Sequence, residues 1–128
     1  MPLFSGLPRR ALERLAGETD ELTFRPGQVV VEEGLLGETL FVVLSGEGKV
    51  VRRGRKLARV LPGDFFGELS ALDGGPRTAT IVAETPLVVL RLFRKTLFDL
   101  VREEPQLALK LMDGIVRRVR EVDRRLES

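Results

Sequence analysis

The sequence predicts a mainly-β domain, a sandwich or barrel, with one helix before the strands and two helices after them. Ten of the thirteen glycines lie between Gly27 and Gly75, where they separate short β-branched or alternating segments. The segments on either side show helical spacing instead. A length of 128 residues suits one domain with a core. We therefore divide a single domain, 1–128, into an N-terminal helical segment (1–19), a β region (20–93) and C-terminal helices (94–128).

Turn signals mark the limits of each predicted element before residue 94. Pro8 is typical of a helix start, and Gly17 is predicted to end that first helix. Strands are predicted at 28–33, 39–46, 48–53 and 56–63, with two more inside 77–93 that separate near Pro86. Tight turns are expected at 46–49 and 52–56.

The C-terminal third predicts two helices, one over 95–104 that ends before Pro105 and one from Gln106 to the C-terminus. Apolar residues of the second helix recur in alternating steps of four and three: Ala108, Met112, Ile115, Val119, Val122 and Leu126. This seam packs either on the domain's own barrel or on a second copy, and its regular spacing favours a parallel homodimer. Gly114 interrupts the pattern: either it stays within the helix at a cost of about 1 kcal/mol relative to Ala, or Asp113–Gly114 is a break or hinge.

Composition removes several classes of function. The chain has no Cys and no His, so it lacks thiol chemistry, the commonest general base and the commonest metal ligand. We therefore expect neither an enzyme nor a metal cofactor. No apolar run is long enough to span a membrane, and the N-terminus lacks a signal-peptide pattern, so we expect a cytoplasmic protein.

The arginine-rich tail has two interpretations. Residues 117–128 hold five Arg and three acidic residues, in a chain of net charge +2. A nucleic-acid surface is one interpretation, and the solvated face of a helix is the other. Because acidic residues are interleaved with the arginines and no second recognition helix follows, direct DNA binding is not expected.

Residues 66–83, FGELSALDGGPRTATIVA, hold the candidate site. A short helix over 68–72, closed by Gly74, would leave free N–H groups after Gly67, and such groups form an anion site. Arg77 can supply the charged fork that matches a phosphate, while Glu68 is suited to accept a hydrogen bond from a neutral hydroxyl. The pattern therefore favours a sugar phosphate. A structural ion pair between Glu68 and Arg77 is the alternative.

The same stretch resembles the phosphate-binding cassette of cyclic nucleotide-binding domains, which occur in the catabolite activator family, protein kinase A regulatory subunits and nucleotide-gated channels. The family pattern is F-G-E-[LM]-[AS]-L, a turn, then P-R-[ST]-A-T, and residues 66–80 match it with the family's spacing. The matching residues are Gly67, Glu68, Leu69, Ser70, Leu72, Pro76, Arg77, Thr78, Ala79 and Thr80. Residues 4–16, 25–34, 39–50 and 61–68 resemble other parts of the family.

The resemblance implies a jelly-roll-like β-barrel (double-stranded β-helix) around a cyclic nucleotide, expected to be cAMP, with cGMP as the alternative. Glu68 and the Gly67 backbone would hold the ribose 2'-hydroxyl, and Arg77 would pair with the cyclic phosphate. The resemblance further assigns to the ligand Leu69, the amides of Ser70 and Thr78, and, against the base, Val60 and Leu61. Met112, Ile115 or an arginine among 117–120 would close over the base. The Thr78 hydroxyl either favours guanine or belongs to an ordinary strand residue.

Two functions follow as hypotheses. The first is a stand-alone cyclic nucleotide sensor without a helix-turn-helix, in which ligand draws the cassette and final helix inward and alters a dimer or effector-protein surface in signal transduction. The second is a ligand-independent dimerisation scaffold that retains the barrel. Its contacts would be the final helix and Leu35–Leu36, which stand where relatives usually have a small polar turn.

Overall fold

A computed structural model describes the backbone of residues 3–127 and the side chains of residues 3–121. The helices are α1 (Arg9–Glu18), α2 (Glu68–Asp73), α3 (Arg94–Glu103) and α4 (Gln106–Glu127). The strands are β1 (Asp20–Phe24), β2 (Val29–Val31), β3 (Thr39–Ser45), β4 (Gly48–Arg52), β5 (Arg55–Val60), β6 (Phe65–Phe66), β7 (Thr80–Ala83) and β8 (Leu87–Phe93).

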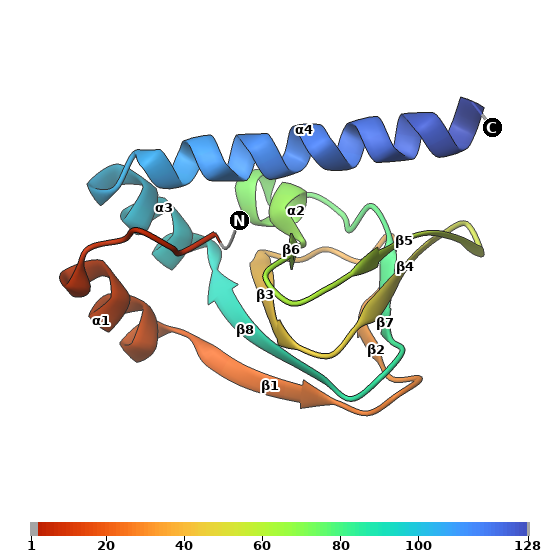
Figure 1. The fold of residues 1–128 in the computed structure, drawn as a ribbon, viewed down its shortest axis with the longest axis horizontal. Helices are drawn as coiled ribbons and strands as arrows, with labels where there is room; N and C mark the ends of the chain where they lie inside the picture. Colours follow the sequence, from red (N-terminus) through yellow and green to blue (C-terminus); the bar gives the residue numbers. More distant parts are fainter. Residues whose placement is uncertain (1–2, 128) are drawn as a thin grey trace.

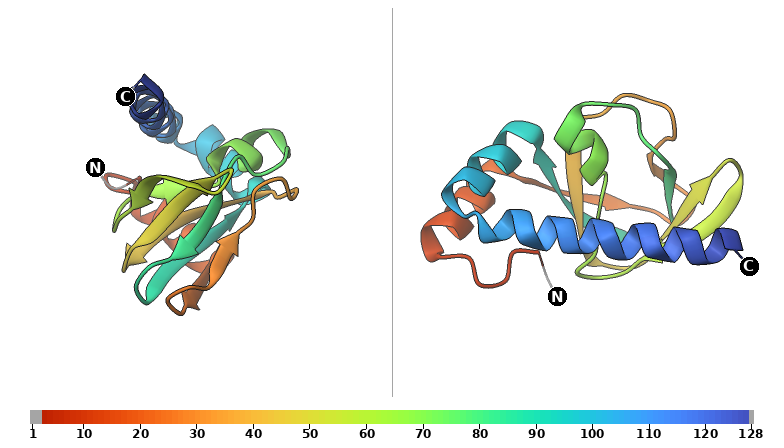
Figure 2. Two further views of the ribbon diagram at one scale, coloured as in Figure 1. Left: turned by 90° about the vertical axis from the view of Figure 1, so that its right-hand side faces the viewer. Right: turned by 90° about the horizontal axis from the view of Figure 1, so that it is seen from above.

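The strands form two antiparallel four-stranded sheets, in the orders β1-β8-β3-β6 and β2-β7-β4-β5. Figure 1 shows α4 lying across the roll, with α1 and α3 gathered at one end and α2 beneath α4. Two further views show α4 as a straight rod along one side of the barrel (Figure 2). The predicted jelly-roll-like barrel with flanking helices is confirmed.

Two apolar clusters form the core. One fills the space between the sheets and includes Phe41, Phe66, Leu87 and Val89, with the rings of Phe41 and Phe66 stacked 5.0 Å apart. The other joins α1, α3 and the start of α4 to one sheet, around buried leucines of all three helices. The helices therefore have a fixed base at one end of the roll, from which α4 extends along the barrel.

The predicted end of one helix needs correction, and two strands were missed. Gly17 does not end α1, because the helix continues to Glu18 and closes where the Thr19 hydroxyl donates to the Leu15 carbonyl at 2.6 Å. Two strands were not predicted individually: β1, which lies inside the region 20–93 predicted as β, and β6, whose two residues are too few to show an alternating pattern.

Gly114 does not break α4, which continues through it. A Cβ atom at this position would overlap the ring of Phe65 on β6. Glycine therefore serves close packing between α4 and the roll, at a cost of about 1 kcal/mol in helix propensity. Within residues 3–127, no helix is both long and apolar enough to cross a bilayer.

The predicted seam of α4 is divided between the domain's own core and the solvent-exposed face: Ile115 packs inward, whereas Met112 and Val119 are exposed. Leu107 and Leu111 are the residues of this helix that are buried in the core, and Ile115 packs against the same cluster. The exposed apolar residues are Leu109, Met112, Val116 and Val119, which still follow steps of three, four and three. Val122 and Leu126 lie outside the residues whose side chains are described.

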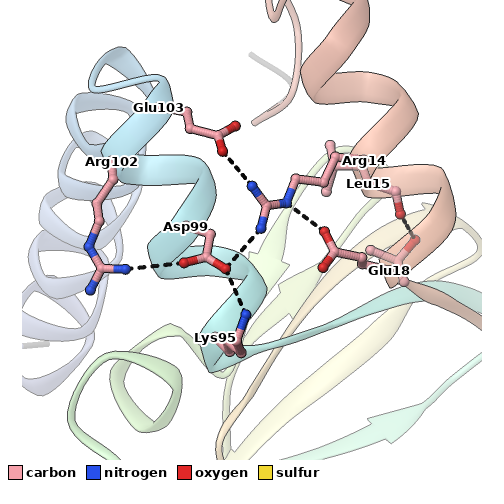
Figure 3. A network of polar contacts seen from close by, with 8 residues as sticks. Arg14, Leu15, Glu18, Lys95, Asp99, Arg102 and Glu103 are labelled. Atoms are coloured by element: carbon pink, nitrogen blue, oxygen red, sulfur yellow. Dashed lines mark hydrogen bonds and ion pairs between the residues drawn. The ribbon is translucent and has the colours of Figure 1, made fainter.

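An ion-pair cluster ties α1 to α3 (Figure 3). The Arg14 guanidinium contacts Glu18 at 2.6 Å, Asp99 at 2.9 Å and also Glu103. Asp99 in turn accepts from Lys95 and Arg102, both at 3.1 Å. Hydrogen bonding from Lys95 lowers the pKa of the Asp99 carboxyl, and the positive charges of its neighbours lower it further.

Candidate functional site

A cavity of about 310 Å³ opens between the roll, the 66–80 segment and α4. The barrel contributes Val31, Val50, Arg52, Phe66 and Ile81; the 66–80 segment contributes Gly67, Glu68, Leu69, Ser70, Arg77, Thr78 and Ala79; α4 contributes Ile115, Arg118 and Val119. The fold therefore brings six of the eight predicted site residues to one cavity. An apolar wall with a few convergent charged groups is typical of a small-molecule site.

Glycines shape the cassette at both ends of α2. Gly67 stands before the helix with φ of 79°, and Gly74 closes it with φ of 70° while donating to the Ser70 carbonyl at 2.7 Å. A Cβ on Gly67 would lie 2.6 Å from a nitrogen of Arg77 and 2.8 Å from the Thr39 carbonyl. Both the positive φ and the crowding require glycine there. The predicted short helix and its Gly74 end are confirmed.

Arg77 is buried and reaches under the cassette. Its Nη1 donates to the Thr39 carbonyl at 2.8 Å and to the Gly67 carbonyl at 3.3 Å, while Nη2 donates to the Thr39 hydroxyl at 2.7 Å. Burial lowers the pKa of this guanidinium, and the charge of Glu68 opposes the shift. The group stays protonated at neutral pH. Among the described residues no carboxylate pairs with it, so a buried positive charge faces the cavity without an anion.

Glu68 is also buried, and its partner comes from α4. Both carboxylate oxygens accept from Nη1 of Arg118, at 2.8 and 2.7 Å. The second terminal nitrogen of Arg118 donates to the Phe65 carbonyl, and the guanidinium lies 5.4 Å from the centre of the Phe65 ring. The ion pair between Glu68 and Arg77 considered from the sequence is therefore replaced by one between Glu68 and Arg118. Arg118 was predicted only as one of several arginines in 117–120.

Three of the residues predicted to contact the base lie elsewhere. Val60 is buried in the core opposite Gly48 of β4 and lines a second cavity of about 230 Å³. Leu61 and Met112 are largely exposed and do not line the 310 Å³ cavity. Because side chains alternate along a strand, the register of β4 and β7 turns Val50 and Ile81 to the cavity instead.

Comparison with known proteins returns one family. The profile of the family described as "Cyclic nucleotide-binding domain" matches residues 21–104. The "Cyclic AMP receptor protein" of Thermus thermophilus is 34% identical over 131 residues, which cover 98% of this chain and 61% of that protein. A "cAMP-dependent protein kinase regulatory subunit" of Aspergillus fumigatus is 34% identical over 96 residues, covering 73% of this chain and 23% of that protein.

Solved structures give the same result for the fold. The crystal structure of the Thermus thermophilus catabolite activator protein superposes with a TM-score of 0.83 at 35% identity, covering 99% of this chain and 62% of that one. A structure titled "cAMP bound PfPKA-R" has a TM-score of 0.84 at 22% identity, covering 95% of this chain and 42% of that one, and supports the fold alone. The chain spans about three fifths of the length of the curated bacterial regulators that it matches.

Proposed function

Because the chain belongs to the cyclic nucleotide-binding domain family, we propose that its 310 Å³ cavity binds cAMP and that binding regulates how α4 contacts a second copy or an effector protein. The observation that carries the proposal is the buried guanidinium of Arg77, which faces the cavity with only neutral acceptors. A cyclic phosphate supplies the missing anion. The names of the two relatives quoted above support cAMP as the ligand.

The proposed ligand lies with its phosphate at Arg77 and the amides of Ser70 and Thr78. Glu68 accepts from the ribose 2'-hydroxyl, and it can do so while paired with Arg118, because a carboxylate has about four acceptor positions. The base packs between Val50 and Ile81 of the barrel and the apolar side chains that α4 contributes to the cavity. Thr78 also lines the cavity, and its hydroxyl is the group that would favour guanine over adenine as the base.

Regulation follows from the position of α4. This helix supplies Arg118, Ile115 and Val119 to the cavity, so a bound nucleotide changes its contacts directly. The exposed residues Leu109, Met112, Val116 and Val119 form the face that we propose pairs with α4 of a second copy. The proposed role is regulatory, not catalytic and independent of metal, in the cytoplasm.

Isothermal titration calorimetry with cAMP and with cGMP tests the function. We expect one site per chain, tighter binding of cAMP, and a rise in melting temperature with ligand. Native mass spectrometry of the purified protein would identify a nucleotide carried through purification. No heat and no thermal shift at millimolar concentration of either nucleotide would contradict the proposal.

The exposed apolar face of α4 also supports the second candidate, a dimerising scaffold that does not respond to ligand. Light scattering with and without cAMP separates the two candidates. A sensor changes its oligomeric state or its hydrogen exchange in α4 when cAMP binds, whereas a scaffold keeps both unchanged.

A further inference from the structure

An exposed leucine pair stands on the loop between β2 and β3. Leu35 is 58% exposed and Leu36 is 79% exposed. Leu36 forms an isolated β-bridge with Pro76, which is also exposed. We call Leu35, Leu36 and Pro76 the Leu35–Leu36 patch. Two adjacent leucines left in water on a loop that is held by backbone hydrogen bonds indicate a contact surface.

The patch is fastened to the residue proposed to hold the phosphate. The Gly34 N–H donates to the Arg77 carbonyl and the Arg77 N–H donates to the Leu35 carbonyl, both at 2.9 Å. Gly37 lies so close to the Arg77 guanidinium that a Cβ atom there would overlap it. Figure 2 shows the β2–β3 loop and the segment between α2 and β7 running side by side, away from α4. Backbone hydrogen bonds therefore connect Arg77 directly to Leu35, and a shift of Arg77 on ligand binding would reach the patch through them.

The electrostatics of this loop select the kind of partner. Residues 32–38 hold three acidic residues and no basic one, and one of the three, Glu33, accepts from the Arg53 N–H of the β4–β5 turn at 2.9 Å. Glu32 and Glu38, on either side of the leucine pair, are both exposed. An apolar surface between carboxylates complements a segment whose apolar side chains are bordered by Lys or Arg.

We propose that the Leu35–Leu36 patch docks a basic amphipathic segment of a partner protein, and that nucleotide bound at Arg77 changes the affinity of this docking. The docking itself is independent of the proposed function, whereas the change in affinity rests on it. Because linkage is reciprocal, the docked segment changes nucleotide affinity by the same factor.

A model peptide tests the docking. The probe is a fluorescein-labelled helical peptide of about 18 residues with leucines on one face and lysines at the borders of that face. Its binding to the full chain is measured by fluorescence anisotropy. The double variant Leu35→Ser/Leu36→Ser should bind at least about tenfold more weakly than wild type. The matched variant Leu12→Ser, at a leucine that is 45% exposed on α1, should change binding less than about twofold. Retained circular dichroism and retained cAMP binding show that the double variant is folded.

Two results would overturn the docking: equal binding of the double variant, or equal binding of a peptide with glutamates in place of lysines. A change in oligomeric state of the double variant would also overturn it, because the occupant would then be a second copy. Saturating cAMP should change peptide affinity severalfold, and Arg77→Ala should abolish that change. If calorimetry shows cAMP binding but peptide affinity stays constant, the coupling is wrong. If the peptide binds and cAMP does not, the proposed function fails while the docking stands.

Discussion

Two arginine clusters join distant parts of this chain, and they differ in the charge of their acceptors. Arg14 on α1 contacts three carboxylates from α1 and α3, in a partly exposed cluster. Arg77 donates its side-chain hydrogen bonds to carbonyl and hydroxyl oxygens of Gly67 and Thr39, and the residue is 8% exposed. The first cluster is neutralised by the protein's own acids, whereas the second is not.

The difference separates a structural arginine from one arranged for a ligand. Exposed ion pairs contribute little each, and their partners are already present. A buried cation without an anion is costly, so the fold must hold it in place by other means, here three hydrogen bonds and the glycines that surround it. A bound phosphate would offset that cost without rearranging the barrel.

Substitution of Arg77 should have the largest effect. We expect Arg77→Ala to weaken cAMP binding at least about 100-fold, because charge-assisted hydrogen bonds to the phosphate are lost. Calorimetry measures the change. The matched variant Arg14→Ala should lower the melting temperature and leave cAMP affinity within about twofold. Equal affinities of Arg77→Ala and wild type would mean that the cassette has been misread.

Alanine substitutions at two helical glycines test how tightly α4 and α1 are packed at these positions. Gly114→Ala should destabilise the fold by about 1–3 kcal/mol in urea unfolding, because its methyl group would overlap the Phe65 ring. Gly17→Ala, on α1 near Arg14, meets nothing within 4 Å and should stabilise by up to about 1 kcal/mol. A stabilising Gly114→Ala would show that α4 does not pack against the roll at this point.

Glu68 can be tested with a matched ligand. We expect Glu68→Gln to weaken cAMP binding about tenfold, since a charged acceptor for the ribose hydroxyl becomes neutral. The 2'-deoxy analogue of cAMP should bind wild type about tenfold more weakly than cAMP does, yet should lose little more when Glu68 is changed. Additive losses from the variant and the deoxy ligand would place the ribose hydroxyl away from Glu68.

Local chemistry made the cassette predictable from the sequence. Gly67 and Gly74 could be predicted because each sits at a helix end with positive φ, where glycine has a distinct role. Arg77 could be predicted because a lone guanidinium among core-forming residues needs an acceptor. These signals lie within 15 consecutive residues, 66–80, so no tertiary information was required.

Contacts between distant elements could not be predicted in the same way. The pairing of Glu68 with Arg118 joins residues 50 positions apart, and the α4 periodicity did not show which turn meets the cassette. The sequence left open whether Gly114 breaks the helix, because its partner, Phe65, is remote in sequence. The wall residues Val50 and Ile81 depended on strand register, which a run of apolar residues leaves undetermined.

The smallest predicted effect concerns acid stability of the Arg14 cluster. Because the pKa of the Asp99 carboxyl is lowered in the folded state, chiefly by the hydrogen bond from Lys95, the unfolded chain binds the proton more readily. The stability that this carboxylate contributes is complete above the unfolded pKa of about 4 and is lost as pH falls through the lower folded pKa. Melting temperature should therefore fall less steeply between about pH 5 and pH 2 in Asp99→Asn than in wild type. Lys95→Ala should give an intermediate slope, and parallel curves for all three proteins would show that the cluster does not contribute to acid sensitivity.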